Sequence, residues 1–313
     1  MALLDQAIVR LLPAMPRPVV RRISSRYIAG DHLTDATATV RALNEQHKLA
    51  TIDVLGEEIT NEAETHVIAR AYEEVLSEIA RRHLAANVSV KPTALGLGLD
   101  YALCLQNLRR LVGFARIRGN FVRVDMEDTT TTDATLQLYR DLRAEGYENL
   151  GIVLQASLKR TAADVDALAP LRPNVRLCKG IYVESPRLQY RDDNAVRTSF
   201  MRSLEALFDA GCYVGIATHD DFLIIHGERL GNERRLSRDE YEFQMLLGVR
   251  PELGNKIVAR YHKLRIYVPF GPYWYEYSLR RLQENPSIAG YIASDTVGRV
   301  LHPGRDESLS DAR

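Results

Sequence analysis

Eight short runs rich in β-branched and aromatic residues recur along the chain, with amphipathic stretches between them. We expect strands at residues 50–56, 88–93, 121–126, 151–156, 174–179, 213–218, 241–246 and 264–270. Residues 62–83, 99–118, 132–145 and 193–210 carry apolar residues at three- and four-residue spacing, which is typical of helices that cover a sheet. Alternating strands and helices predict an α/β protein with a parallel sheet.

Eight repeats favour a closed, distorted (βα)8 barrel of the TIM type over an open doubly wound sheet. The open sheet remains an alternative, because the first and seventh runs are also compatible with helices. The 313 residues suffice for one such barrel. We expect extra N-terminal helices packed on the barrel in residues 1–47, the catalytic barrel in residues 48–303 and a polar tail in residues 304–313.

The charge balance argues against a nucleic-acid binder, because Lys+Arg and Asp+Glu number 41 each. The three cysteines are widely spaced and form no metal motif, which fits a reducing, cytoplasmic compartment and no bound metal. No apolar run approaches the roughly 18–20 residues that span a bilayer.

The N-terminal stretch is basic. It allows two interpretations: a presequence or membrane-surface segment, or a short basic helix on the barrel interrupted by prolines. Its cations are Arg10, Arg17, Arg21, Arg22 and Arg26, against the single acid Asp5. A peripheral contact with the inner face of the plasma membrane is the corresponding expectation.

Polar residues gather where the predicted strands end, which is where (βα)8 barrels place their chemistry. In chain order they are Glu57, Lys91, Asp125, Glu127, Gln155, Arg176, Lys179, Gly180, Tyr182, Thr218, His219, Asp220, Gln244, Leu246 and Tyr267. Most charges beside strands are loop charges or helix caps. Lys91, Asp125 and Arg176 differ, because each lies inside an apolar strand where an unpaired charge is costly. A structural ion pair is the alternative explanation for these three.

A helix is expected after the last strand, in the run YWYEYSLRRLQE at residues 273–284. Tyr277, Arg281 and Glu284 fall on one face of that helix, with Arg280 beside it. Adjacent guanidinium groups with aromatic neighbours make a good clamp for a carboxylate. A solvent-exposed arginine pair on a surface helix is the alternative.

Six segments resemble the proline dehydrogenase family, over roughly residues 52–297. They are VSVKPTALG (88–96), FVRVDMED (121–128), VRLCKGIYVE (175–184), GIATHD (215–220), YEFQMLLG (241–248) and RIYVPFG…WYEYSLRRLQE (265–284). The resemblance implies a barrel that holds FAD and oxidises L-proline to 1-pyrroline-5-carboxylate by hydride transfer, the first step of proline catabolism. It also implies electron transfer to a membrane quinone and a separate downstream pyrroline-carboxylate dehydrogenase, because no aldehyde dehydrogenase domain follows in this sequence.

The resemblance also assigns roles to residues. Arg280, Arg281 and Lys91 would bind the proline carboxylate, Asp125 would orient these cations, and Glu57 would pair with Arg280 as a gate. The walls of the proline site would be Tyr182, Leu246, Tyr267 and Tyr277. Arg176 would approach the flavin near N5, and Gln155 would contact the isoalloxazine. The rest of FAD would be held by Lys179, Gly180, Thr218, His219 and Glu284. Ile181, Ser185 and Asp220 depart from the usual family residues.

Three other functions remain open from the residues alone. Lys179 at a strand end suits a class I aldolase that forms a Schiff base. His219 and Asp220 are adjacent, as in a metal-dependent hydrolase, but no second strand-end His or Cys completes a ligand set. A ligand-binding or scaffold barrel would be a colourless protein that tolerates Arg280→Ala.

Overall fold

The structure is a computed structural model that describes residues 21, 26–56, 59–275, 277 and 278. Arg26–Pro272 form one compact unit, and Met1–Ser25 with Tyr273–Arg313 form a second. In the second unit, Arg21 lies over the Trp274 ring at 5.6 Å from its centroid. The domain boundaries expected at residues 47/48 and 303/304 stay predictions.

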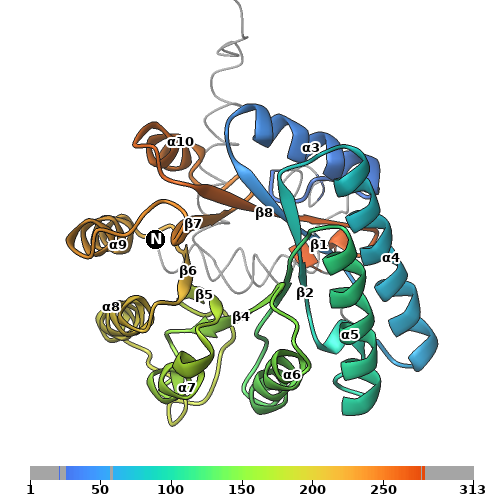
Figure 1. Ribbon diagram of the computed structural model, residues 1–313, viewed down its shortest axis with the longest axis horizontal. Helices are drawn as coiled ribbons and strands as arrows, with labels where there is room; N and C mark the ends of the chain where they lie inside the picture. The colour runs from blue at the N-terminus through green and yellow to red at the C-terminus, as the bar shows by residue number, and fades with distance from the viewer. Residues whose placement is uncertain (1–20, 22–25, 57–58, 276, 279–313) are drawn as a thin grey trace, which may run out of the picture. The chain divides into compact units, whose positions relative to one another are not determined.

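Eight parallel strands close into a barrel in sequence order, which confirms the predicted architecture (Figure 1). The strands are β1 (Leu49–Val54), β2 (Ala86–Val90), β3 (Val122–Val124), β4 (Leu150–Gln155), β5 (Asn174–Cys178), β6 (Tyr213–Ala217), β7 (Tyr241–Leu246) and β8 (Leu264–Phe270). Each predicted run overlaps one of them, including the first and the seventh, and the closed strand order excludes the open-sheet alternative. β1 pairs with both β2 and β8, which closes the sheet.

Helices surround the strands on the outside (Figure 1). They are α3 (Leu33–Glu45), α4 (Glu62–Arg81), α5 (Tyr101–Ile117), α6 (Thr132–Ala144), α7 (Thr161–Leu168), α8 (Asp193–Asp209), α9 (Asp221–Glu233) and α10 (Pro251–Ala259). The four predicted helices correspond to α4, α5, α6 and α8. α3 precedes β1 and is an extra N-terminal helix of the kind expected.

Polar caps fix where several helices begin after a strand-end loop. Asn61 accepts a hydrogen bond from the Glu64 N–H at 3.2 Å, and Asp100 accepts one from the Leu103 N–H at 2.8 Å. Asp220 caps α9 by accepting from the Phe222 N–H at 3.1 Å. These side chains accept hydrogen bonds from N–H groups that the helix itself leaves unpaired, and they therefore fix the residue at which each helix begins.

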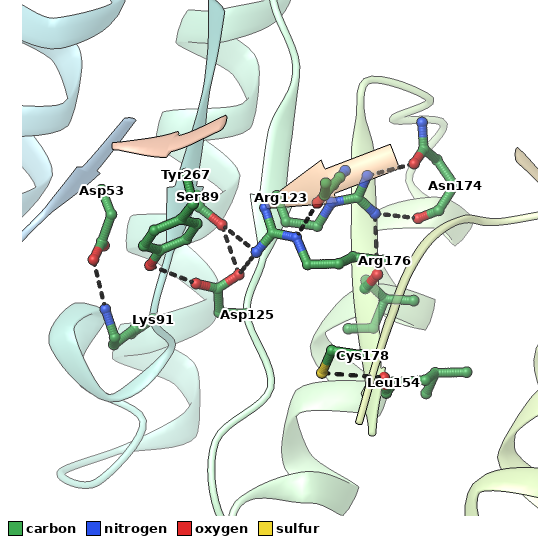
Figure 2. Close-up of polar contacts among 12 residues, drawn as sticks. Asp53, Ser89, Lys91, Arg123, Asp125, Leu154, Asn174, Arg176, Cys178 and Tyr267 are labelled. Carbon is green, nitrogen blue, oxygen red and sulfur yellow. Dashed lines mark hydrogen bonds and ion pairs between the residues drawn. The ribbon is translucent and has the colours of Figure 1, made fainter. Parts of the chain in front are cut away.

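The interior of the barrel is polar, whereas branched apolar residues usually fill such interiors. Neighbouring strands in register present the same face, so Ser89 lies beside Arg123 and Arg176 beside Gly215. Arg123 donates to the Ile152 carbonyl at 3.0 Å and also to Asn174 (Figure 2). The alternate residues point outward and form the apolar core between strands and helices. Examples are Ile52, Val88, Val122, Leu177, Val214, Phe243 and Val268.

Among the described residues, no helix combines the length and apolar character that crossing a membrane requires.

Candidate active site

A buried ion pair between Arg176 and Asp125 lies inside the barrel toward the carboxyl ends of the strands (Figure 2). Arg176 Nη1 donates to Asp125 Oδ1 at 2.7 Å, and the two side chains are 9% and 12% exposed. The Ser89 hydroxyl donates to the same oxygen at 2.6 Å, and the Tyr267 hydroxyl donates to Oδ2 at 3.2 Å. The guanidinium also lies over the Tyr267 ring at 5.4 Å. Three donors therefore satisfy the acceptor oxygens of the Asp125 carboxylate.

The other edge of the Arg176 guanidinium contacts β7. Its Nε donates to Gln244 Oε1 at 2.6 Å, and Gln244 Nε2 donates to Glu242 Oε1 at 2.7 Å. Arg265 binds Glu242 through two hydrogen bonds of 2.6 and 3.0 Å. Burial alone would raise the pKa of Glu242, but the charge of Arg265 and the hydrogen bonds outweigh burial and lower the pKa.

Nη2 of Arg176 is the one nitrogen of this guanidinium that donates to no protein group in the described part of the chain. Nε and Nη1 are both engaged, so the free edge is fixed in direction. A guanidinium edge held in this way is a ready donor for a bound group with hydrogen-bond acceptors.

Lys91 pairs with Asp53 at 2.8 Å, and both side chains are buried (Figure 2). The Tyr72 hydroxyl, from α4, lies 3.0 Å from Asp53 Oδ1 and 2.8 Å from the Ser89 carbonyl. Burial, and then the charge of Asp53, raises the pKa of Tyr72, so the phenol remains protonated. Sequence reasoning missed Asp53 and Tyr72, although Asp53 is a charge inside the apolar strand β1 and could have been found by the argument that found Lys91.

Asp125 was predicted to orient the cations that bind the substrate. Among the described residues its ion pair is with Arg176, while Asp53 is the ion-pair partner of Lys91. The predicted role of Asp125 toward Arg280 and Arg281 stays a prediction, because those two residues lie outside the described ones.

Gln155 and Gly180 lie next to each other at the ends of β4 and β5. Gln155 Nε2 donates to the Glu127 carbonyl at 2.7 Å, while the Glu127 carboxylate accepts from the Thr93 N–H at 3.0 Å. Gly180 has φ of +103°, and a Cβ there would overlap the Ser157 hydroxyl and lie 3.2 Å from Gln155 Oε1. Only glycine fits both the conformation and the space.

Lys179 is held by Asp220 at 2.6 Å, and Arg197 Nε binds the same carboxylate oxygen at 2.8 Å. Burial of Asp220 would raise its pKa, but hydrogen bonds from Arg197 and Lys179 and their charges lower it to about 2. The Thr218 hydroxyl accepts the Asp220 N–H at 3.1 Å. Asp220, which departs from the family pattern, therefore both caps α9 and forms ion pairs with Lys179 and Arg197.

His219 is neutral at physiological pH, because burial and then the charge of Arg250 lower its pKa to about 4. Its Nε2 accepts the Leu246 N–H at 3.0 Å. In a neutral imidazole that accepts at Nε2, the proton lies on Nδ1, so that nitrogen is a donor. Leu246, half-buried at the end of β7, is therefore positioned through its backbone by His219.

The remaining predicted residues lie in the loop after β5 or beyond the described barrel. Tyr182 is half-buried, and its carbonyl accepts from Gln189 Nε2 at 2.8 Å. Tyr277 belongs to the second compact unit, so its predicted contact with proline stays a prediction. Glu57, Arg280, Arg281 and Glu284 lie outside the described residues.

A closed (βα)8 barrel with buried, paired charges toward the carboxyl ends of its strands defines a barrel enzyme with its site at that face. A family model described as "Proline dehydrogenase" matches residues 36–294. The chain belongs to the proline dehydrogenase family. It is an oxidoreductase that acts on proline and catalyses the first step of proline catabolism. This membership excludes the aldolase, hydrolase and scaffold alternatives.

Curated relatives agree with the family model over most of the chain. "Proline dehydrogenase 1" of Bacillus subtilis (strain 168) is 36% identical over 267 residues, which cover 85% of this chain and 88% of the relative. "Proline dehydrogenase" of Deinococcus radiodurans is 34% identical over 285 residues, with 89% and 91% covered.

A solved structure shows the same fold. Proline utilization A (PutA) from Bdellovibrio bacteriovorus matches with a TM-score of 0.79 at 22% identity, covering 93% of this chain. The match covers 36% of that longer polypeptide, so this chain corresponds to about a third of it.

Asp220→Asn tests the ion pairs around Lys179. Asparagine keeps the helix cap but removes the charge. A carboxylate whose folded-state pKa lies at about 2, below the unfolded value of about 3.9, gives stability that is present above pH 4 and lost as the pH falls toward 2. We expect the variant to lose about 1 kcal/mol of unfolding free energy at pH 7, and the difference from wild type to vanish near pH 2.

Urea unfolding across this pH range measures the effect. The exposed Asp166 of α7 supplies the control, because Asp166→Asn should show no pH-dependent difference. An equal loss for Asp220→Asn at pH 7 and near pH 2 would show that the charge of Asp220 does not stabilise the fold.

Proposed function

We propose that the chain oxidises L-proline to 1-pyrroline-5-carboxylate with FAD as the hydride acceptor, and that the electrons pass to a membrane quinone. The observation that carries this proposal is the Arg176 guanidinium, fixed by Asp125 and Gln244 with its Nη2 edge left for a ligand. Family membership supports a flavin as that ligand. The product would then be a substrate for a pyrroline-carboxylate dehydrogenase.

The residues present fit a flavin nucleotide. Gly180 lets the loop after β5 approach Ser157 and Gln155 more closely than any residue with a Cβ could, which holds the Gln155 amide against this loop. Arg176 offers a cationic donor and His219 a neutral one, which suits a ring system with several acceptors. We assign Gln155, Arg176, Lys179, Gly180, Thr218 and His219 to FAD, with Glu284 added from the family resemblance alone.

Bound FAD would supply an acceptor for the hydride that leaves C5 of the proline ring. The protein's part is mainly positioning. Lys91, with Arg280 and Arg281, would bind the substrate carboxylate, and Asp53 keeps the Lys91 ammonium in place before the substrate arrives. Clustered cations would also lower the pKa of the substrate amine, which must be uncharged for its lone pair to assist hydride departure.

The charge of Arg176 would favour electron acceptance beside it, because a fixed cation stabilises developing negative charge. Asp125 offsets part of this charge and so sets its strength. Tyr182, Leu246, Tyr267 and Tyr277 would enclose the ring and exclude water, while Glu57 with Arg280 would gate the pocket.

An absorption spectrum of the purified protein tests the proposal. We expect flavin bands that bleach when L-proline is added without oxygen, and no bleaching with L-alanine, which has no ring C5. Liposomes that contain a quinone should then restore the bands, whereas liposomes without quinone should not. Absence of flavin after refolding with FAD would refute the cofactor, and bands that quinone liposomes leave bleached would refute the acceptor.

Arg281→Ala tests the carboxylate clamp. Loss of a charged hydrogen-bonding partner should raise the KM for proline by about tenfold to a hundredfold, with FAD content unchanged. Arg202, exposed on α8, gives the matched control, and Arg202→Ala should leave both quantities unchanged. Loss of flavin with an unaltered proline KM would contradict the assignment.

A further inference from the structure

Glu242 and Gln244 lie two residues apart on β7, so both side chains point into the barrel. Glu242 is 1% exposed and is bound by Arg265 through both carboxylate oxygens. Gln244, 5% exposed, lies between Glu242 and Arg176 and is hydrogen-bonded to both. The family resemblance gave neither residue a role.

The charges of Glu242 and Arg176 together decide which way the Gln244 amide faces. A carboxylate can only accept, so the amide must turn its NH2 group toward Glu242, at 2.7 Å. The amide oxygen is then left to accept from Arg176 Nε at 2.6 Å. With a neutral partner at residue 242, Arg176 alone would select this orientation, and the charge-assisted hydrogen bond that holds the other end of the Gln244 amide would be weakened.

Two anchors on different edges hold the Arg176 guanidinium. Gln244 takes Nε, and Asp125 with Ser89 takes Nη1, at 2.7 and 3.0 Å. Because the guanidinium is planar, fixing two of its three nitrogens fixes the direction of Nη2. Without Gln244, the guanidinium would keep only its Nη1 hydrogen bonds and its contact with the Tyr267 ring among the described residues.

Strand β6, which lies between β5 and β7, leaves room for the contact between Gln244 and Arg176. Gly215 on β6 is in register with Arg176 on one side and Glu242 on the other. A Cβ at residue 215 would lie within 2.8 Å of the Gln244 amide. The missing side chain therefore makes the space through which Gln244 reaches Arg176.

We propose that Glu242 and Gln244 are positioning residues for the oxidation of proline, which hold the Nη2 edge of Arg176 toward the cofactor. The proposal rests on the function proposed for Arg176 above. Glu242 acts on Arg176 through Gln244. The competing explanation is that this row of side chains only stabilises the barrel.

The first test needs no cofactor. Hydrogen exchange of the Arg176 side-chain Nε–H is followed by NMR and assigned with Arg176→Lys. We expect slow exchange in wild type and markedly faster exchange in Gln244→Leu and in Glu242→Gln. Glu242→Gln is isosteric with wild type, so it provides the test if Gln244→Leu fails to fold. Unchanged exchange in a folded variant would overturn the proposal.

Thr51→Val is the matched control. Thr51 lies in the barrel interior on β1 and is 1% exposed, and its hydroxyl has no hydrogen-bond partner among the described residues. This variant perturbs the interior to a similar degree without touching β7. Its Arg176 exchange, kcat and flavin potential should match wild type.

The second test uses the flavin-loaded enzyme. Both β7 variants should lower kcat for proline by about tenfold to a hundredfold, with KM within about twofold because the proline site is unchanged. Gln244→Leu should also lower the reduction potential of the flavin, because a displaced cation stabilises the reduced form less. A purely structural role would lower the melting temperature and leave kcat and the potential unchanged, which would refute the proposal.

The two proposals fail in different ways. If the wild-type protein binds no flavin, the function proposed above fails, while the NMR result alone decides whether Gln244 fixes Arg176. If proline bleaches the wild-type flavin but the variants exchange faster with unchanged kcat and potential, the positioning role is wrong and the proposed function stands.

Discussion

The buried ion pair between Asp125 and Arg176 is the interaction on which the barrel interior depends. Burying two charges costs several kcal/mol per ion unless good geometry and further hydrogen bonds compensate. Here the compensation comes from Ser89, Tyr267 and Gln244. These contacts join β2, β5, β7 and β8 to the residue that follows β3, so one pair sets the relative position of five strands.

This arrangement changes where the stability of the barrel originates. Most apolar packing lies outside the strands, where they meet the helices, while the interior is held largely by ion pairs and hydrogen bonds. Such an interior gains little from hydrophobic burial, but it fixes polar groups in single orientations. That property suits an enzyme whose chemistry depends on placing a substrate and a cofactor, and it explains why Gly180 and Gly215 stand where neighbouring polar groups need space.

The strands and several helices could be predicted from the sequence. Apolar residues recur every second position in strands and every third or fourth position in helices. Lys91, Asp125 and Arg176 could be found because each is a charge inside an apolar run that predicts a strand. Their partners could not be identified. Lys91 meets Asp53 from 38 residues away, and Arg176 meets Gln244 from 68 residues away. Contacts between residues this far apart in the sequence depend on how the strands are aligned in the barrel, and local residue spacing does not reveal that alignment.

Asp220 shows the same limit on another scale. The sequence shows only that residue 220 departs from the usual family residue, whereas in the fold Asp220 caps α9 and binds Lys179 and Arg197. The roles expected of Glu57, Arg280, Arg281 and Glu284 remain predictions from the family resemblance, because these residues lie outside the described ones.

A double-mutant cycle on Asp125→Asn and Arg176→Gln, measured by urea unfolding at pH 7, tests the central claim most directly. Each single variant leaves a buried group without its partner and should lose about 3 kcal/mol or more. The double variant should lose less than the sum of the two by at least about 1 kcal/mol, because the two side chains are in contact. Strictly additive losses would contradict the claim that this pair organises the site.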